Sequence, residues 1–211
     1  MIPRLCYISD TERGTGGRDR IGVIEALFAG GLRMLVLRDR SATAATFRGW
    51  IRALAPLRAR GLRVLVSRRL DLARAFDLDG VHLAADAVPL VVARRWLPEG
   101  TWIGYSAHSG AEAREAERAG ATYVTLSPVY ATGSKPKALG RGCDWLRDAA
   151  GSLGVPALAL GGLRPERVPE VLEAGAWGVA AVSALGAAQD PAAAARAFLR
   201  ALDPGGKGES K

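Results

Sequence analysis

Short apolar runs alternate along this chain with longer segments in which apolar and polar residues recur at helical spacing. The apolar runs are rich in β-branched residues and predict strands at residues 4–9, 34–37, 63–66, 80–83, 101–106, 123–126, 157–160 and 178–182. The helical pattern between them is clearest at residues 44–60, 110–119, 165–174 and 191–202. This alternation is typical of a parallel α/β architecture.

Local signals mark several ends of these elements. Ser109 can cap the helix predicted at 110–119, which Gly120 ends directly ahead of the next apolar run. Pro165 and Pro191 stand in first-turn positions of the last two predicted helices. These signals support the alternation of strands and helices.

The number and size of the repeating units predict one α/β domain, a single (β/α)8 TIM barrel over residues 1–203. Strand and helix pairs packed into about 200 residues match the lower size range of that fold. A doubly wound open sheet is the alternative, but it usually has a Gly-rich turn after its first strand, where this chain reads Ser9-Asp10-Thr11-Glu12-Arg13. The polar, Gly-rich residues 204–211 predict a disordered tail.

A formal net charge of +8 raises the question of nucleic-acid binding. The arginines are scattered through all the predicted helices and form no single stripe with interleaved aromatic residues, which indicates a solvated basic surface. We therefore expect no nucleic-acid partner. No apolar run is long enough to span a bilayer, so we expect no membrane partner either.

The two cysteines and two histidines exclude an ordinary zinc site, because Cys6 and Cys143 form no CxxC motif. This cysteine usage favours a reducing compartment, and we expect a cytoplasmic protein. Cys143 stands at the start of a predicted helix, where its thiol pKa could be lowered, but a packing role is the favoured interpretation.

In a TIM barrel the chemistry lies at the carboxyl ends of the strands, so the polar residues that follow each strand are the candidates for function. They are Arg38, Arg40, Ser67, Arg68, Ser106, His108, Ser109, Thr132, Ser134 and Lys135, with His82 on the fourth strand. Gly161-Gly162 and Val182-Ser183 end the last two strands. Loops at those positions commonly hold a phosphate, so we expect these four residues to bind one.

The two histidines are the imidazole candidates for a base. His108 follows the fifth strand on the expected active face, and orienting its loop through a backbone hydrogen bond is the alternative. Strand alternation sends His82 to the face opposite Val81 and Leu83, either toward the barrel mouth or into the core.

Several motifs in one order resemble those of the thiamine phosphate synthase and TenI superfamily, over residues 4–198. They are "GLRMLVLRDR", "DLDGVHLAADAVP", "IGYSAHS", "LSPVYATGSK", "ALGGL", "VLEAGAWGVAAVSAL" and "DPAAAA". In that superfamily, synthases join a hydroxymethylpyrimidine diphosphate to a thiazole phosphate and release pyrophosphate, with Mg2+ held by acidic residues. TenI-type members lack the metal carboxylates and, where active, tautomerise a thiazole carboxylate phosphate.

The resemblance implies a role for each matching position. Arg38, Arg40 and Ser109 correspond to diphosphate contacts, and Lys135 to a loop lysine. Thr132 and Ser134 correspond to contacts with thiazole phosphate, and Gly162 with Ser183 to phosphate loops.

This chain departs from the family pattern at the expected metal ligands. The family's Asn-Asp after the third strand is Ser67-Arg68 here, and its next Asp is replaced by Ala87. Either Arg68 replaces the charge of the metal, or the diphosphate reaction is lost and thiazole phosphate binding remains. Asp86 could supply one ligand, but one carboxylate beside an arginine is a poor Mg2+ site. We expect no metal site and no cofactor, with Mg2+ needed only if synthase activity is retained.

Three functions follow, with a small phosphorylated thiazole or pyrimidine as the ligand. The favoured one is a TenI-like thiazole tautomerase that uses His108 or His82, since the tautomerase base of TenI-type proteins is replaced here by Pro128. The first alternative is a thiamine phosphate synthase, with Lys135 in its catalytic loop. The second is a non-catalytic, regulatory protein that binds a phosphorylated metabolite. A homodimer is compatible with this sequence.

Overall fold

The described residues form a closed barrel of eight parallel strands, each hydrogen-bonded to the next in chain order, with β8 against β1. The structure is a computed structural model that describes residues 1–10, 15–132, 139–203 and 205. The strands are β1 (Leu5–Ser9), β2 (Met34–Leu37), β3 (Arg63–Ser67), β4 (Gly80–Leu83), β5 (Trp102–Ala107), β6 (Tyr123–Leu126), β7 (Ala157–Leu160) and β8 (Gly178–Ala181). The predicted (β/α)8 TIM barrel is confirmed.

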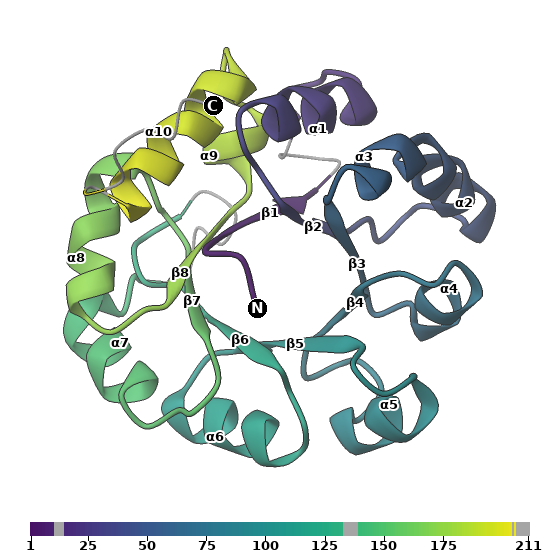
Figure 1. Ribbon diagram of the computed structural model, residues 1–211. Coiled ribbons are helices and arrows are strands. Elements are labelled where there is room, and N and C mark those ends of the chain that lie inside the picture. The colour runs from purple at the N-terminus through teal and green to yellow at the C-terminus, as the bar shows by residue number, and fades with distance from the viewer. Residues whose placement is uncertain (11–14, 133–138, 204, 206–211) are drawn as a thin grey trace.

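A ring of helices surrounds the barrel (Figure 1). They are α1 (Arg20–Ala29), α2 (Ala44–Ala53), α3 (Ala55–Ala59), α4 (Leu70–Ala75), α5 (Leu90–Trp96), α6 (Gly110–Arg118), α7 (Gly142–Ala150), the 3₁₀ turn η1 (Pro165–Arg167), α8 (Val168–Glu173), α9 (Ser183–Gly186) and α10 (Pro191–Leu202). The main core lies between this ring and the strands. None of the helices in the described part of the chain is long and apolar enough to cross a membrane.

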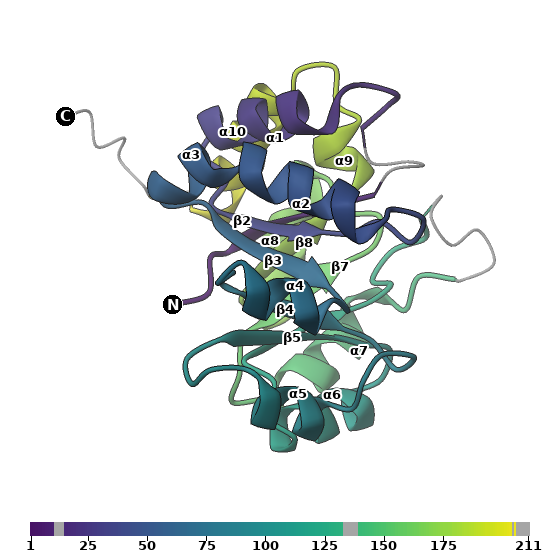
Figure 2. The same ribbon diagram turned by 90° about the vertical axis from the view of Figure 1, so that its right-hand side faces the viewer.

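Side chains fill the inside of the barrel. A second apolar cluster there is made of Ile2, Cys6, Ile8, Met34, Val36, Leu65, Tyr123, Leu158 and Ala180. The ring of Tyr123 occupies the space that Gly104 leaves open, since a Cβ on Gly104 would lie 2.1 Å from the Tyr123 ring. Figure 2 shows the barrel from the side, with the N-terminus at one end and the loops that follow the strands at the other.

Two predicted helices are interrupted, and a proline explains each interruption. The helix predicted at 44–60 is two helices, α2 and α3, because Pro56 has no N–H to continue the hydrogen-bond ladder. The helix predicted at 165–174 begins as the 3₁₀ turn η1 and becomes α-helical only at Val168, next to Pro169. Predicting continuous helices at these two places was wrong.

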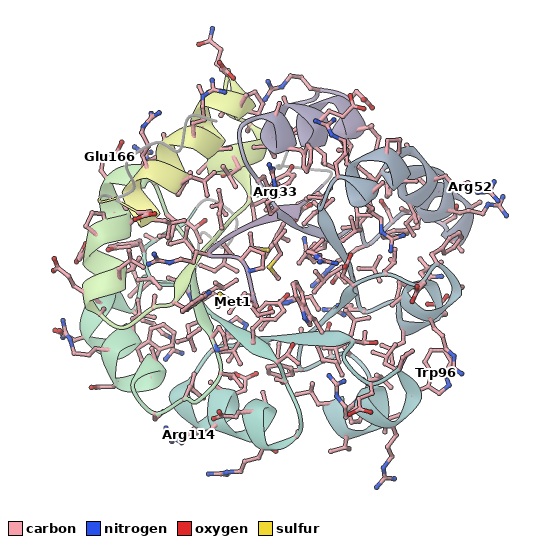
Figure 3. All side chains as sticks on the ribbon, viewed as in Figure 1. Met1, Arg33, Arg52, Trp96, Arg114 and Glu166 are labelled. Carbon is pink, nitrogen blue, oxygen red and sulfur yellow. The ribbon has the colours of Figure 1, made fainter. Side chains whose placement is uncertain are left out.

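Other local predictions are confirmed. The Ser109 side chain accepts a hydrogen bond from the Glu112 N–H, and α6 ends at Arg118, before Gly120 at a φ of 100°. The labelled Arg52 and Arg114 lie on separate helices at the outside of the ring (Figure 3). Apart from Gly205, the predicted tail lies outside the described residues.

Candidate active site

A cavity of about 390 Å³ opens at the carboxyl ends of the strands. Most of the predicted site residues line it: Arg38, Arg40, Ser67, Arg68, His82, Ser106, His108, Thr132, Gly161, Gly162, Val182 and Ser183. The fold therefore brings together candidates from strands β2 to β8. Ser134 and Lys135 lie outside the described residues.

The loop after β2 presents Arg38 and Arg40 to the cavity, while the side chain of Asp39 between them is buried. Asp39 forms an ion pair of 2.9 Å with Arg20, and the two side chains are only 3% and 5% exposed. Asp39 also accepts hydrogen bonds from the N–H groups of Ser41 and Ala42. These contacts hold the loop from below, so its two cationic neighbours are positioned at the cavity wall.

Arg38 is held in addition by the end of β1. Its guanidinium forms an ion pair with Asp10, and its N–H donates to the Ser9 hydroxyl over 3.3 Å. Asp10 thereby orients a cation toward the cavity and partly neutralises it.

Arg68, directly after β3, has a left-handed backbone with a φ of 66°. Its N–H donates to the carbonyl of His82, and its guanidinium makes two hydrogen bonds to the Asp86 carboxylate, at 2.7 and 2.5 Å. This contact lowers the pKa of Asp86. Asp86 therefore remains an anion paired with Arg68.

His82 points into the barrel, and both of its ring nitrogens have partners. Nδ1 lies 2.9 Å from the Tyr123 hydroxyl, and Nε2 lies 2.9 Å from the Ser106 hydroxyl. Burial, and to a smaller extent the charge of Arg38, together lower the pKa of His82 to about 4. His82 is thus a neutral, hydrogen-bonded residue at the floor of the cavity, and a weak base.

His108 makes the backbone hydrogen bond of the loop-orienting alternative, and its role as a base stays a prediction. It lines the cavity, and its Nδ1 lies 2.8 Å from the Ser127 carbonyl oxygen. Because a carbonyl only accepts, Nδ1 carries the proton in the neutral ring and Nε2 carries the lone pair. The His108 N–H also donates to the Glu112 carboxylate.

Ser109 does not line the cavity. Its hydroxyl accepts from the Glu112 N–H over 3.1 Å, so it caps α6. The structure shows the capping role of Ser109, and its contact with a diphosphate stays a prediction.

The loops after β7 and β8 form the wall facing Arg68, since β3 and β7 are opposite in a ring of this strand order. Gly161 and Gly162 have φ values of 103° and 63°, and a Cβ on Gly162 would lie 2.5 Å from the Ala131 carbonyl oxygen. Val182 and Ser183 lead into α9, whose first N–H groups lack partners within the helix. This wall is suited to an anion that approaches the backbone closely.

Cys143 lies beside Tyr130. The Tyr130 hydroxyl is 3.3 Å from the Cys143 sulfur, and it donates a hydrogen bond of 2.5 Å to the Glu170 carboxylate. Burial raises the pKa of the Cys143 thiol. Cys143 is therefore a protonated, packed thiol, which agrees with the packing role expected for it and not with an activated nucleophile.

Comparison with known proteins identifies the family. Residues 5–185 match the family described as thiamine monophosphate synthase. This chain belongs to the thiamine monophosphate synthase family. It is 40% identical to the thiamine-phosphate synthase of Chloroflexus aurantiacus over 201 residues, 94% of this chain and 92% of that protein. It is 38% identical to the thiamine-phosphate synthase of Natronomonas pharaonis over 201 residues, 93% of this chain and 94% of that protein.

Solved structures agree with this assignment. The thiamine phosphate pyrophosphorylase of Pyrococcus furiosus superposes with a TM-score of 0.85 at 28% identity, covering 95% of this chain and 96% of that one. The names of these relatives support the synthase alternative better than the tautomerase that we favoured from the sequence. The comparisons do not by themselves distinguish a synthase from a TenI-like tautomerase.

The charged residues of this family member do not fit a Mg2+ ion. No group of three potential metal-ligating side chains exists among the described residues. The carboxylates of Asp10 and Asp86, which line the cavity, are each paired with an arginine. Mg2+ requires near-octahedral oxygen ligands, and cations at both carboxylates oppose its binding. We therefore assign no role to a metal in this cavity.

Sequence patterns missed several partners of the site residues. Asp10 lines the cavity and directly follows β1, so its position after a strand could have identified it as a candidate site residue. The pairs Arg20–Asp39 and His82–Tyr123 had no such signal, because their members are 19 and 41 residues apart.

Proposed function

We propose that this family member is a thiamine-phosphate synthase, which joins a hydroxymethylpyrimidine diphosphate to a thiazole phosphate and releases pyrophosphate. The named relatives support this reaction class, since they match nearly the whole chain and most of their own length. The proposal assigns the cavity at the strand ends to both substrates.

The observation that carries the proposal is the distribution of anion-binding groups in the cavity. Arg38, Arg40 and Arg68 line the side formed by the ends of β2 and β3. Gly162, in the loop after β7, and Ser183, at the start of α9 after β8, line the facing side. Two phosphorylated substrates that react with each other need two such regions around one apolar space, and the apolar residues Ile8, Leu160 and Ala180 also line the cavity.

The chemistry matches this distribution. The thiazole nitrogen forms a bond to the methylene carbon of the pyrimidine, while the bond from that carbon to the diphosphate oxygen breaks. The oxygen keeps the electron pair, so negative charge grows on the departing pyrophosphate. Fixed guanidinium groups at the cavity wall would stabilise that charge as it develops, and the buried Arg20–Asp39 pair would keep two of them in place.

The histidines have supporting roles in this reaction, because the thiazole nitrogen attacks through its own lone pair and requires no base. His82 would maintain the cavity floor through Tyr123 and Ser106. His108 would hold the loop after β5 against Ser127. Neither histidine transfers a proton in this reaction.

The test is product formation by the purified full chain. Incubation with both substrates should yield thiamine phosphate and pyrophosphate in equal amounts, measured by chromatography and a pyrophosphate assay. Arg38→Ala should lower kcat/KM by about tenfold or more, the loss expected for a charge-assisted hydrogen bond. Arg69→Ala is the control, since Arg69 pairs with Asp71 and does not line the cavity.

Absence of thiamine phosphate would contradict the synthase. The same protein should then be incubated with the thiazole carboxylate phosphate in deuterated water. Exchange of the ring proton would support the tautomerase, and binding of thiazole phosphate with no turnover would support the regulatory protein.

A further inference from the structure

The strongest unassigned feature of the cavity is the ion pair between Arg68 and Asp86. The guanidinium and the carboxylate meet through two hydrogen bonds, at 2.7 and 2.5 Å, and both residues line the cavity. The Arg68 side chain is 31% exposed and the Asp86 side chain 64%. Exposed pairs of this kind are weak because water screens both charges, so a better anion can replace the carboxylate.

The backbone conformation of Arg68 indicates that its position at the cavity is functional. A φ of 66° is unfavourable for a side chain other than Gly, Asn or Asp, and the N–H bond to the His82 carbonyl maintains it. Strained backbone of this type is retained where the surrounding structure imposes it and concentrates at functional sites. Here it points an arginine from the end of β3 toward the cavity.

The neighbouring charges favour an anion over a metal ion. Among the described residues that line the cavity, three are arginines and two are aspartates, and each aspartate is paired with an arginine. The charge of Arg40 also acts on Asp86, which places a second guanidinium near the pair. If Asp86 turned outward, Arg68 and Arg40 would face the same space without a competing carboxylate.

We propose that Arg68 binds the diphosphate of the pyrimidine substrate directly, without a divalent metal ion, and that Asp86 occupies Arg68 until the diphosphate displaces it. The proposal rests on the proposed function for the identity of the ligand. Arg68 is then a binding residue that replaces the metal's charge, and Asp86 is a competitor whose removal strengthens binding. A planar guanidinium suits this exchange, since it forms the same two-bond contact with carboxylate and with phosphate oxygens.

Calorimetric titration with inorganic pyrophosphate tests the proposal in the presence of EDTA. Wild-type protein should bind pyrophosphate there, and Mg2+ in place of EDTA should not tighten the binding. Arg68→Asn should weaken binding about tenfold or more, as expected for loss of charge-assisted hydrogen bonds. Asn tolerates the left-handed backbone, so this variant removes the charge without adding strain. Arg69→Ala, one residue away, should bind like the wild type.

Asp86→Ala provides an opposite and independent readout. Removing the competing carboxylate should tighten pyrophosphate binding in EDTA, a gain that a folding defect would not produce, and Asp86 is exposed, so its removal leaves the core intact. Binding by the wild type only with Mg2+, unchanged binding by Arg68→Asn, or weaker binding by Asp86→Ala would each overturn the proposal.

The two proposals fail in distinguishable ways. If the protein makes thiamine phosphate only when Mg2+ is supplied, the synthase stands and the direct role of Arg68 fails. If pyrophosphate binds in EDTA through Arg68 but no thiamine phosphate forms, the anion site stands and the synthase fails.

Discussion

Arg20 and Asp39 form a buried ion pair of 2.9 Å directly behind the two arginines of the β2 loop. The guanidinium of Arg20 also lies 3.9 Å from the centre of the Trp50 ring, and it donates to the carbonyl of Arg38 over 3.4 Å. The pair therefore joins α1, α2 and the loop between β2 and α2. It couples the stability of the fold to the position of the cavity arginines.

Breaking this pair should destabilise the protein strongly. Asp39→Ala leaves Arg20 buried without its carboxylate, so the free energy of unfolding should fall by about 3–5 kcal/mol. Urea unfolding followed by circular dichroism measures this. Asp144→Ala removes an exposed pair with Arg147 and should change the free energy by less than about 0.5 kcal/mol. Equal effects of the two substitutions would contradict the structural role of the buried pair.

His82 should make stability depend on pH. Its pKa is lowered from 6.5 to about 4 in the folded protein, so the unfolded chain takes up the proton first. The stabilisation is complete above pH 6.5 and is lost as pH falls toward 4, by roughly 3 kcal/mol in total. Melting temperatures measured across this range should fall more steeply for the wild type than for His82→Gln. Parallel curves for the two proteins would show that His82 does not cause the loss.

Gly162 should be intolerant of a side chain. Gly162→Ala combines a left-handed backbone with a Cβ 2.5 Å from the Ala131 carbonyl, and the expected loss of stability is about 1–3 kcal/mol. The shifted loop should also raise KM for thiazole phosphate more than it lowers kcat. Gly49→Ala is the matched control, because Gly49 lies in α2 with open space around its Cβ position, and a gain of about 0.5–1 kcal/mol is expected.

Both cysteines should react slowly in the folded protein. Burial raises the pKa of Cys6 to about 12 and also raises that of Cys143, so little thiolate exists at pH 8. Mass spectrometry after iodoacetamide treatment should find the native protein largely unmodified and the urea-unfolded protein modified at both thiols. Rapid modification of native Cys143 would contradict the packed, protonated thiol.

The local pattern of the chain determined the elements and the architecture. The predicted strands at 34–37, 80–83, 123–126 and 157–160 have the observed bounds. Their apolar runs and the turn residues around them act over a few residues, and the parallel order then requires the strand ends to meet at one side. The same reasoning placed most candidate residues around one cavity.

Only the tertiary structure decided which side chains contact each other. Ser106 and Ser109 are only three positions apart, yet Ser109 caps α6 while Ser106, at the end of β5, hydrogen-bonds with His82. Arg68 meets Asp86 because β3 and β4 lie side by side, although 18 residues separate them along the chain. Such contacts depend on the relative positions of whole strands and loops. Local preferences determine each strand or helix separately, and only the closed barrel determines the distances between side chains on different elements.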